Sequence, residues 1–557
     1  MVSRYISRFD HAMPWILLVL LVLVLCFGLL VPIYSDEVAI HMSKARFFLE
    51  RGQLVTLLPQ CDTSPTIQVP VTWYPAAILY GFVYALPGGL GLRLTGIALG
   101  LSYLCLLWFW VGKLFQNAKW KNIFRTLIIA INGLGVLPLI LILARSEQIL
   151  VLSMLLLCLF SIFWCTNETE SGRLKTLKVV AFLLLVSTFY YTHPKSLFFS
   201  PFVVIAAFYI FRKENSYAKA AIFSVIVFAA YQTLQQAKNL NCLGAPIVSK
   251  ILSQVTIDFQ LLSTSALKFF EIGGDNVFRS LDAVVGRLLF ASSYQSAWLP
   301  GLDTPALASG VMFLNFAIEN SLILGVVCLL TTLLFQFTRQ LVRRQISREI
   351  ALAMGLLVGL FVHGFVYNVN SWHFYTPGLI IPIFTIMFLL VVPSGLTYTK
   401  FGERVWYYAS CYGAALSLAS IVCLSLLVFT PLLKAAQKNK YVISGQPLST
   451  SIFLDKNQKT DLLALTSSCS ISADSSRRLV LDGTAYFQFK NQREPINILY
   501  ISEFGFGADI ADKAKEFLNK IDSDGLISRC DYLPEALKGD VIKMGDMCCV
   551  SKSQWQK

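Results

Sequence analysis

Charged side chains are scarce in this chain. Asp, Glu, Lys and Arg make up 14% of its 557 residues, whereas hydrophobic residues make up 56%. Together with a mean hydropathy of +0.63, this composition excludes a water-soluble globular protein of this length. The sequence also lacks CxxC pairs, His-rich tracts, Walker-type phosphate loops, internal repeats and low-complexity segments. No motif therefore indicates a cofactor, and the composition predicts a membrane protein.

The formal net charge of +14 raises the question of a nucleic-acid partner. The basic residues do not form one patch. They fall in short clusters between apolar runs, which is the pattern that sets the topology of a membrane protein. The clusters are Arg4/Arg8, 113–125, 173–178, 212–219, 339–348 and Lys400/Arg404. We therefore expect membrane lipids, and no nucleic acid, as partners.

Placing every basic cluster in the cytoplasm predicts about 11 membrane-spanning helices, with the N-terminus inside and the C-terminus outside. The predicted spans are 14–33, 92–112, 123–143, 148–165, 178–192, 196–211, 220–236, 309–335, 349–367, 375–392 and 406–430. The first run is too long to be a removed signal peptide and lacks a small-residue cleavage site, so we expect a retained helix. The apolar stretch 73–90 has no place among the spans and is predicted to lie against the outer face as a juxtamembrane or re-entrant element.

The predicted fold is therefore an all-α polytopic membrane domain with a small extracytoplasmic α/β domain. The membrane domain covers 1–430, with outer loops 34–91 and 237–308. In the second domain, 431–557, charges increase and short strand-like runs flank a helix-like stretch at 510–521. This domain also contains Cys469, Cys530, Cys548 and Cys549, which predict one or two disulfides of open pairing in an oxidising compartment.

Asp36 and Glu37 stand side by side directly after the first long apolar run, 15–32. That run is uncharged and long enough to cross roughly 30 Å of hydrocarbon, so both carboxylates are expected where a membrane helix meets water. Either acid is a candidate general base, and together they are candidate ligands for Mg²⁺ or Mn²⁺. The simpler interpretation is two solvated loop acids.

Two further groups of candidates lie at predicted outer helix ends. Arg145 and Glu147 lie at the end of the third span, where a simple helix-end anchor explains them about as well as a functional role. The segment His193-Pro194-Lys195 breaks a long apolar run into two helices, because proline cannot continue the first one. Lys195 would then be a fixed cation for an anionic substrate, or alternatively a snorkelling lysine at a plain turn.

The remaining candidates surround the later spans. His373 and Tyr375 open the tenth span, where His373 is a candidate phosphate donor and an interfacial aromatic belt explains Tyr375 equally well. His363 is expected to pack inside the preceding span. Arg279 and Arg287, spaced as two turns of one helix face, are expected to contact lipid headgroups.

These features follow one another along residues 10–395 in an order that resembles a known family. They are Tyr34 to Ala39 with its acidic pair, Trp73-Tyr74-Pro75, Arg93-Leu94, Arg145-Ser146-Glu147, Thr192 to Lys195 and His373 to Pro377. The family is that of the GT-C membrane glycosyltransferases, in particular the branch of the aminoarabinose transferases and protein mannosyltransferases. The chain departs from that branch in having no lysine before Pro75 and in placing His193-Pro194 ahead of Lys195.

The resemblance implies a glycosyltransferase that moves a sugar from a polyprenyl-phosphate carrier to a cell-envelope acceptor, at the outer face of the bacterial inner membrane. The acceptor classes are lipopolysaccharide, lipid A, O-antigen and protein. Asp36 would be the general base, while Glu37 and Glu147 would position the acceptor or hold a divalent cation. The implied substrate-binding residues are Arg145, His193, Lys195, His373, Tyr375, Trp73 and Tyr74; of these, Lys195, Arg145 and His373 would stabilise the leaving phosphate.

Two other classes stay open. A flippase or transporter of lipid-linked sugar would also be polytopic and basic, but it would carry ionisable residues at mid-bilayer and often internal repeats. A polysaccharide polymerase or ligase would also use outer loops, with arginines rather than an early acidic pair as its signature. A purely structural membrane protein has no use for acids and cations on one face.

Overall fold

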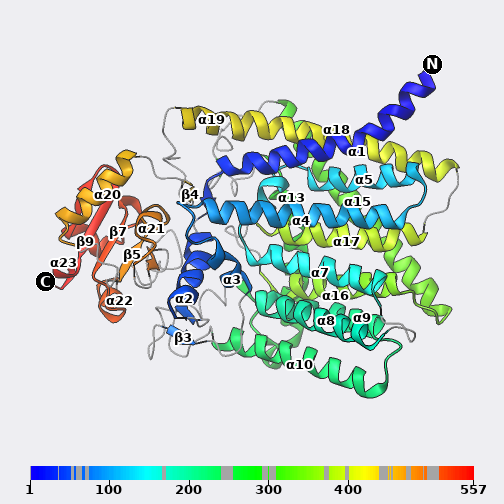
Figure 1. Cartoon of the computed structure of the whole chain (residues 1–557), viewed down its shortest axis with the longest axis horizontal. Coiled ribbons are helices and arrows are strands. Elements are labelled where there is room, and N and C mark those ends of the chain that lie inside the picture. The colour runs from blue at the N-terminus through cyan, green and yellow to red at the C-terminus, as the bar shows by residue number, and fades with distance from the viewer. Residues whose placement is uncertain are drawn as a thin grey trace.

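In the computed structural model, the long helices lie side by side in a bundle, and the C-terminal residues form a separate domain at one end of it (Figure 1). The N-terminus lies at the opposite end. The described residues are 2–34, 37–51, 55–57, 66–68, 75–165, 171–239, 255–290, 299, 309–368, 375–395, 400–437, 449–450, 452, 456–471, 478–492, 495–498 and 514–556.

Each of the eleven predicted spans overlaps a helix of the bundle, although the bounds differ. The helices are α1 (Val2–Phe27), α4 (Leu90–Leu114), α5 (Ala118–Asn132), α7 (Ser146–Phe163), α8 (Gly172–Thr192), α9 (Ser200–Ile210), α10 (Ser216–Asn239), α15 (Ser309–Val342), α16 (Arg348–Val366), α17 (Pro377–Gly395) and α18 (Lys400–Leu424). Among the described residues, eight helical segments are long and apolar enough to cross a membrane, and Pro194–Ile210 and Pro377–Pro393 are shorter apolar helices. The number of crossings and the orientation stay predictions.

The third predicted span, 123–143, is not one helix. Helix α5 ends at Asn132, the chain turns at Gly133 to Val136, and a short helix α6 (Leu137–Ile140) leads into another turn. The break occurs at Gly135, whose φ of +52° is left-handed and whose added Cβ would lie 2.0 Å from the Leu288 carbonyl oxygen. Only glycine meets both conditions. The resulting buried segment, 136–145, ends at Arg145.

The stretch 237–308, predicted as an outer loop, has helices among its described residues. It contains a short helix α12 (Leu261–Thr264) and the longer α13 (Ala266–Gly286). Helix α13 packs against α16, where Gly273 leaves room for the ring of Phe365. Helix α13 therefore lies beside the bundle.

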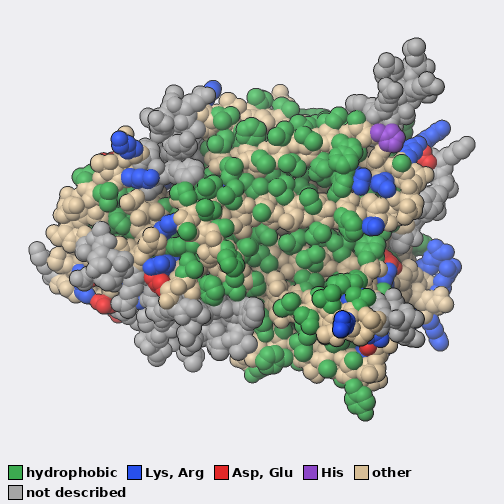
Figure 2. Space-filling view, viewed as in Figure 1, with side chains coloured by type: hydrophobic (Ala, Val, Ile, Leu, Met, Phe, Trp, Pro, Cys, Tyr) green, Lys and Arg blue, Asp and Glu red, His purple; other side chains and the backbone are tan. Residues whose placement is uncertain are grey.

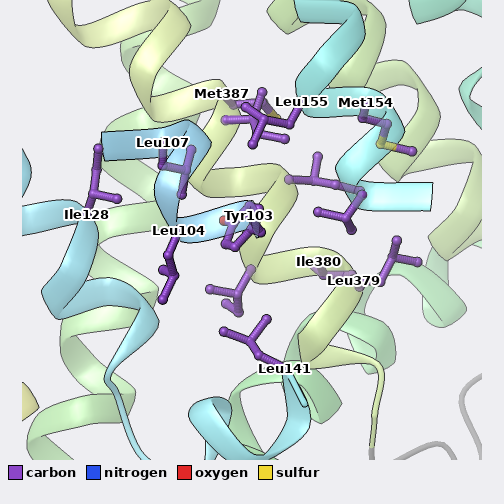
Figure 3. Close-up of a cluster of buried hydrophobic side chains, with 14 of the residues drawn as sticks. Tyr103, Leu104, Leu107, Ile128, Leu141, Met154, Leu155, Leu379, Ile380 and Met387 are labelled. Atoms are coloured by element: carbon purple, nitrogen blue, oxygen red, sulfur yellow. The ribbon is translucent and has the colours of Figure 1, made fainter. Parts of the chain in front are cut away.

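The bundle interior is filled by close-packed apolar side chains (Figure 3). Leu104 and Leu107 of α4, Leu155 of α7 and Met387 of α17 are all fully or almost fully buried. The outside of the bundle is also apolar, and basic side chains gather toward its two ends (Figure 2). On α15, Phe313 and Phe335 expose 72% and 66% of their surface. Such a surface fits a hydrocarbon solvent and would be an aggregation hazard in water.

The C-terminal residues form a mixed five-stranded sheet with helices around it. The strands are β5 (Leu479–Leu481), β6 (Ile496–Asn497), β7 (Gly525–Arg529), β8 (Ile542–Met544) and β9 (Met547–Ser551), in the order β6-β5-β7-β9-β8. The helices are α20 (Lys456–Ser468), α21 (Gly483–Phe489), α22 (Ala514–Lys520) and α23 (Lys552–Trp555). Of the predicted helix 510–521, residues 510–513 lie outside the described part. Two disulfides, Cys469–Cys549 and Cys530–Cys548, join α20 to β9 and the end of β7 to β9.

The C-terminal domain contacts two short helices of the first outer loop, α2 (Ser43–Arg51) and α3 (Pro75–Phe82). The Arg46 guanidinium donates to the Asn491 carbonyl at 2.7 Å. Lys490 Nζ donates to the carbonyls of Tyr84 and Leu86, each at 2.7 Å. Strands β1 (Ile33–Tyr34) and β4 (Ser449–Thr450) form a small antiparallel pair at the same junction. Helix α3 accounts for part of the stretch 73–90 that had no place among the predicted spans.

The close approach of α4 to the buried segment predicts a sharp steric effect. A Cβ on Gly96 would lie 1.9 Å from the Ile142 carbonyl oxygen, whereas a Cβ on Gly325 of α15 would meet nothing within 4 Å. We expect Gly96→Ala to lower the free energy of unfolding by about 1–3 kcal/mol, because the backbone of the segment must move. Gly325→Ala should leave it within about 1 kcal/mol of wild type. Thermal unfolding of both variants in detergent tests this, and equal midpoints would contradict the packing.

Candidate active site

The carboxylate of Glu37 is the centre of a fully buried hydrogen-bond network at one end of the bundle. Glu37 begins a short π-helical segment, η2 (Glu37–Met42), and its side chain and that of Arg93 are 0% exposed. Its Oε2 accepts hydrogen bonds from Arg93 Nη2 at 3.2 Å and from the Tyr34 amide at 2.8 Å. Its Oε1 accepts from the Ala144 amide at 2.6 Å. Both oxygens are therefore engaged by N–H donors.

Arg93, in the first turn of α4, extends the same network. Besides Glu37, its guanidinium donates to the carbonyls of Pro32 at 2.7 Å and Ile142 at 3.0 Å. The pair therefore fastens the end of the first helix, the start of α4 and the buried segment before Arg145 to one another. Ion pairs with several added hydrogen bonds are the kind that can offset the desolvation of both charges.

This donor set does not fit a metal ligand. Divalent cations such as Mg²⁺ need free oxygen lone pairs, and a guanidinium beside the carboxylate repels them. The predicted metal role of Glu37 is therefore not supported by its surroundings. Within the described part of the chain, no three His, Cys, Asp or Glu side chains gather as a metal site. A metal at Asp36 stays a prediction, since that residue lies outside the described part.

A second buried network centres on Glu147. It includes Arg145, the residue that follows Ala144 of the first network. Arg145 precedes α7 and Glu147 lies in its first turn, where the helix dipole favours a carboxylate. Glu147 Oε1 accepts from Lys195 Nζ at 2.9 Å, and Oε2 accepts from Arg145 Nε at 3.3 Å. The exposed fractions of these side chains are 5–7%. Arg145 and Lys195 are thus not solvated anchors at helix ends.

The break between α8 and α9 positions Lys195. Pro194 begins a 3₁₀ helix, η3 (Pro194–Phe199), directly after α8 ends at Thr192. His193 Nδ1 accepts a hydrogen bond from the Lys195 amide at 3.0 Å, and its Nε2 lies 3.9 Å from Glu147 Oε1. The imidazole thus caps η3, and Lys195 is directed into the bundle toward Glu147.

Two tyrosines cover the cations. The Arg145 guanidinium lies 3.4 Å from the ring centroid of Tyr375, and Lys195 Nζ lies 4.7 Å from that of Tyr367. Both contacts are cation–π interactions in a buried setting.

The position of Arg287 shows that its predicted contact with lipid headgroups is wrong. The spacing of Arg279 and Arg287 predicted two headgroup contacts on one helix face, but α13 ends at Gly286 and Arg287 is its buried C-cap. Arg287 Nη1 donates to Thr376 Oγ1 at 3.4 Å, and its charge also acts on the Tyr367 phenol. Arg279 stays on the surface and pairs with Asp275 at 2.9 Å. The spacing of Arg279 and Arg287 predicts a shared face only within one continuous helix, and α13 ends before Arg287.

His363 and Tyr367 are further residues near this network. As the sequence predicted, His363 is fully buried within α16, with its ring 5.1 Å from that of Tyr367 and 5.6 Å from that of Phe198. Tyr367 follows the end of α16, and its neighbour Asn368 donates its amide to the Val255 carbonyl at 2.8 Å. The sequence offered no signal for Tyr367, because an aromatic residue at a helix end is common in any membrane protein.

The structure thus brings together Arg145, Glu147, His193, Lys195 and Tyr375, which the sequence proposed from three separate stretches. Glu37 lies in the adjoining network, since the Ala144 amide that it binds precedes Arg145. Asp36, Trp73, Tyr74 and His373 lie outside the described residues. The roles of all these residues stay predictions.

Known proteins offer similarity in overall arrangement only. No protein-family model and no curated protein matches the sequence. The crystal structure of ArnT from Cupriavidus metallidurans bound to undecaprenyl phosphate is similar over 99% of this chain and 98% of its own, with 12% identity and a TM-score of 0.44. The archaeal oligosaccharyltransferase AglB from Archaeoglobus fulgidus, in complex with an inhibitory peptide and a dolichol-phosphate, is similar over 92% of this chain and 69% of its own, with 12% identity and a TM-score of 0.41.

The burial of the Glu37–Arg93 pair predicts a large loss of stability when one partner is removed. We expect Glu37→Met to lower the free energy of unfolding by about 3–5 kcal/mol, because Arg93 is left charged and buried. The double variant Glu37→Met/Arg93→Met should recover part of that loss. Asp275→Ala, which breaks the exposed pair with Arg279, should cost less than about 1 kcal/mol. Thermal unfolding in detergent measures all of them; a Glu37→Met protein as stable as Asp275→Ala would contradict the anchoring role.

Proposed function

We propose that this chain is a membrane glycosyltransferase that moves a sugar from a polyprenyl-phosphate carrier to a cell-envelope acceptor. The observation that carries the proposal is the cluster of buried basic side chains at one end of the bundle. Arg145, Lys195 and Arg287 act on one small region around Tyr367, and in that region Glu147 is the one carboxylate that the described residues contribute.

A cluster of buried cations is suited to an anionic ligand. Taking a charge out of water costs several kcal/mol, and that cost is offset only by an opposite charge or by good hydrogen bonds. Glu147 neutralises one of the cations, through oxygens 2.9 and 3.3 Å from Lys195 and Arg145. A phosphate would supply further oxygens that accept from guanidinium and ammonium groups.

The surroundings favour a phosphate that is carried by a lipid. The cluster lies where α7, α8, α16 and α17 begin or end, so it adjoins the apolar surface of the bundle. A prenyl chain can remain in the hydrocarbon while its phosphate reaches a site at this depth. A water-soluble sugar nucleotide has no apolar part that would use this arrangement.

The predicted roles then form one reaction. An acceptor hydroxyl attacks the anomeric carbon of the carrier-linked sugar and loses its proton to Asp36. The bond between that carbon and the phosphate oxygen breaks, and the carrier leaves as a phosphomonoester. Lys195 and Arg145 stabilise the charge that develops on the leaving phosphate, which is where preorganised cations contribute most to the rate. Glu147 holds both cations in place, and Glu37 fixes the backbone beside Asp36.

A flippase or transporter has less support. In such proteins the substrate site lies near the midplane, between helices that are broken there. Here the ionisable cluster lies at helix ends on one side of the bundle. The sugar and the acceptor stay open in this proposal, and acceptors of the envelope are expected from the predicted outer orientation.

If Asp36 is the general base, replacing it should change the rate of sugar transfer and leave the stability of the protein unchanged. Asp36→Asn should lower turnover by about 10²–10⁴-fold, because the amide cannot take the proton of the acceptor hydroxyl. The thermal midpoint should stay close to wild type, in contrast to Glu37→Met. Sugar transfer by membranes that contain the natural donor and acceptor measures the rate. Near-normal turnover would return Asp36 to the interpretation of a solvated loop acid.

The phosphate role predicts an effect on binding. Lys195→Ala should weaken the binding of polyprenyl phosphate, the product that the proposed reaction releases, by about 10-fold or more, since a charge-assisted hydrogen bond is lost. Lys195→Arg should retain part of the affinity, because the charge is kept while the geometry changes. The matched control is Lys268→Ala, which removes the same charge from an exposed position on α13.

Titration of the purified proteins with polyprenyl phosphate, followed by native mass spectrometry, separates the outcomes. Equal affinity of the wild type and the Lys195→Ala variant would show that Lys195 does not contact the phosphate. Equal loss in the Lys268→Ala variant would show a general effect of net charge. Either result would overturn the proposed site without altering the fold.

A further inference from the structure

A basic pocket lies at the end of the bundle opposite the candidate active site. It is a cavity of about 580 Å³ between the C-terminal ends of α9 and α15 and the start of α16, and its walls include Arg212, Arg343 and Arg344. Helix α16 begins at Arg348 beside this cavity and ends at Val366 beside Tyr367. The full length of a 19-residue helix therefore separates the two sites.

The arginines of this pocket are not neutralised by the described part of the protein. All of them are exposed, and the structure gives none of them an ion pair with a described residue. The nearest acids are engaged elsewhere: Glu214 pairs with Lys175 at 3.9 Å, and Glu349 pairs with Arg348 at 3.0 Å. The pocket therefore carries a local excess of positive charge.

The turn that carries two of the arginines is held in place by its neighbours. Gln340 Oε1 accepts a hydrogen bond from the Ser347 amide at 2.7 Å, and the Tyr209 hydroxyl donates to the Ile346 carbonyl at 3.2 Å. Arg344 has a φ of 54°, a left-handed conformation that only a well-defined turn maintains. The guanidinium groups thus project from a fixed loop rather than from a frayed helix end.

The apolar rim of the pocket is defined by Phe208, which lines it, and by Leu341 and Val342, which lie between the lining residues Gln340 and Arg343 in the sequence. These three side chains expose 50%, 53% and 79% of their surface. A cationic pocket with an apolar rim matches an amphiphile whose charged part sits in the pocket and whose chains lie against the rim. A free phosphate ester would use only the arginines.

We infer that this pocket binds the phosphate headgroup of an anionic phospholipid. By the predicted orientation it faces the cytoplasmic leaflet, whose anionic lipids attract clustered Lys and Arg. The guanidinium groups supply paired N–H donors for phosphate oxygens, and the aromatic and aliphatic rim covers the first methylenes of the acyl chains.

The test compares two triple variants of the full-length protein in detergent. Arg212→Gln/Arg343→Gln/Arg344→Gln removes the pocket cations. Lys113→Gln/Arg173→Gln/Arg404→Gln removes as many charges from exposed positions at the same end of the bundle, outside the pocket. Native mass spectrometry follows titration with phosphatidylglycerol, with phosphatidylcholine, and with phosphatidylglycerol in the presence of sn-glycerol 3-phosphate.

We expect the wild type to bind one phosphatidylglycerol at least about 10-fold more tightly than phosphatidylcholine, and the pocket variant to lose that preference. The control triple variant and Lys195→Ala should keep it, which separates this site from the candidate active site. Retained binding in the pocket variant, or an equal loss in the control, would overturn the inference. Displacement by an equal concentration of sn-glycerol 3-phosphate would also overturn it, because the ligand would then be a free phosphate ester.

Discussion

The rest of the site depends on how the Glu37 carboxylate is held. Glu37 binds Arg93 of α4, the Tyr34 amide after α1 and the Ala144 amide before α7, all without contact with water. In a bundle surrounded by hydrocarbon, apolar packing alone gives little preference for one helix register over another. A buried carboxylate with three fixed partners does give such a preference, because each misplaced partner would leave a charge or an amide unsatisfied. Because Arg145 directly follows Ala144 in the chain, the contact of Glu37 with the Ala144 amide also positions Arg145.

The candidate site then works by contrast between two buried carboxylates. Glu37 is paired with Arg93 and serves as an anchor, whereas Glu147 contacts two cations, Arg145 and Lys195. The rings of Tyr375 and Tyr367 pack against those cations. Low polarity around fixed cations strengthens their attraction for a phosphate and removes the cost of reorienting solvent during transfer. On the opposite side of the bundle, the exposed pocket of Arg212, Arg343 and Arg344 also places clustered cations beside apolar side chains.

Much of this could be read from the sequence, and the failures have identifiable causes. Long uncharged runs between basic clusters located the helices, and charged residues next to those runs located Arg145, Glu147 and Lys195. The break in 123–143 was missed because Gly135 is required by a contact with Leu288, which is far away in the sequence. The anchoring role of Glu37 was missed for a similar reason, since its partner Arg93 lies 56 residues further along the chain. Local patterns identify which residues are unusual, whereas their partners are set by packing.

The most direct test of the central claim is an experimental structure of the full-length protein with polyprenyl phosphate bound. We expect the phosphorus atom within about 4 Å of both Lys195 Nζ and the Arg145 guanidinium, a separation set by direct hydrogen bonds to the phosphate oxygens. The prenyl chain should leave the site along the apolar surface of the bundle. A phosphate bound elsewhere, with Lys195 and Arg145 in contact only with Glu147 and the tyrosines, would contradict the claim that this buried charge exists to bind a lipid phosphate.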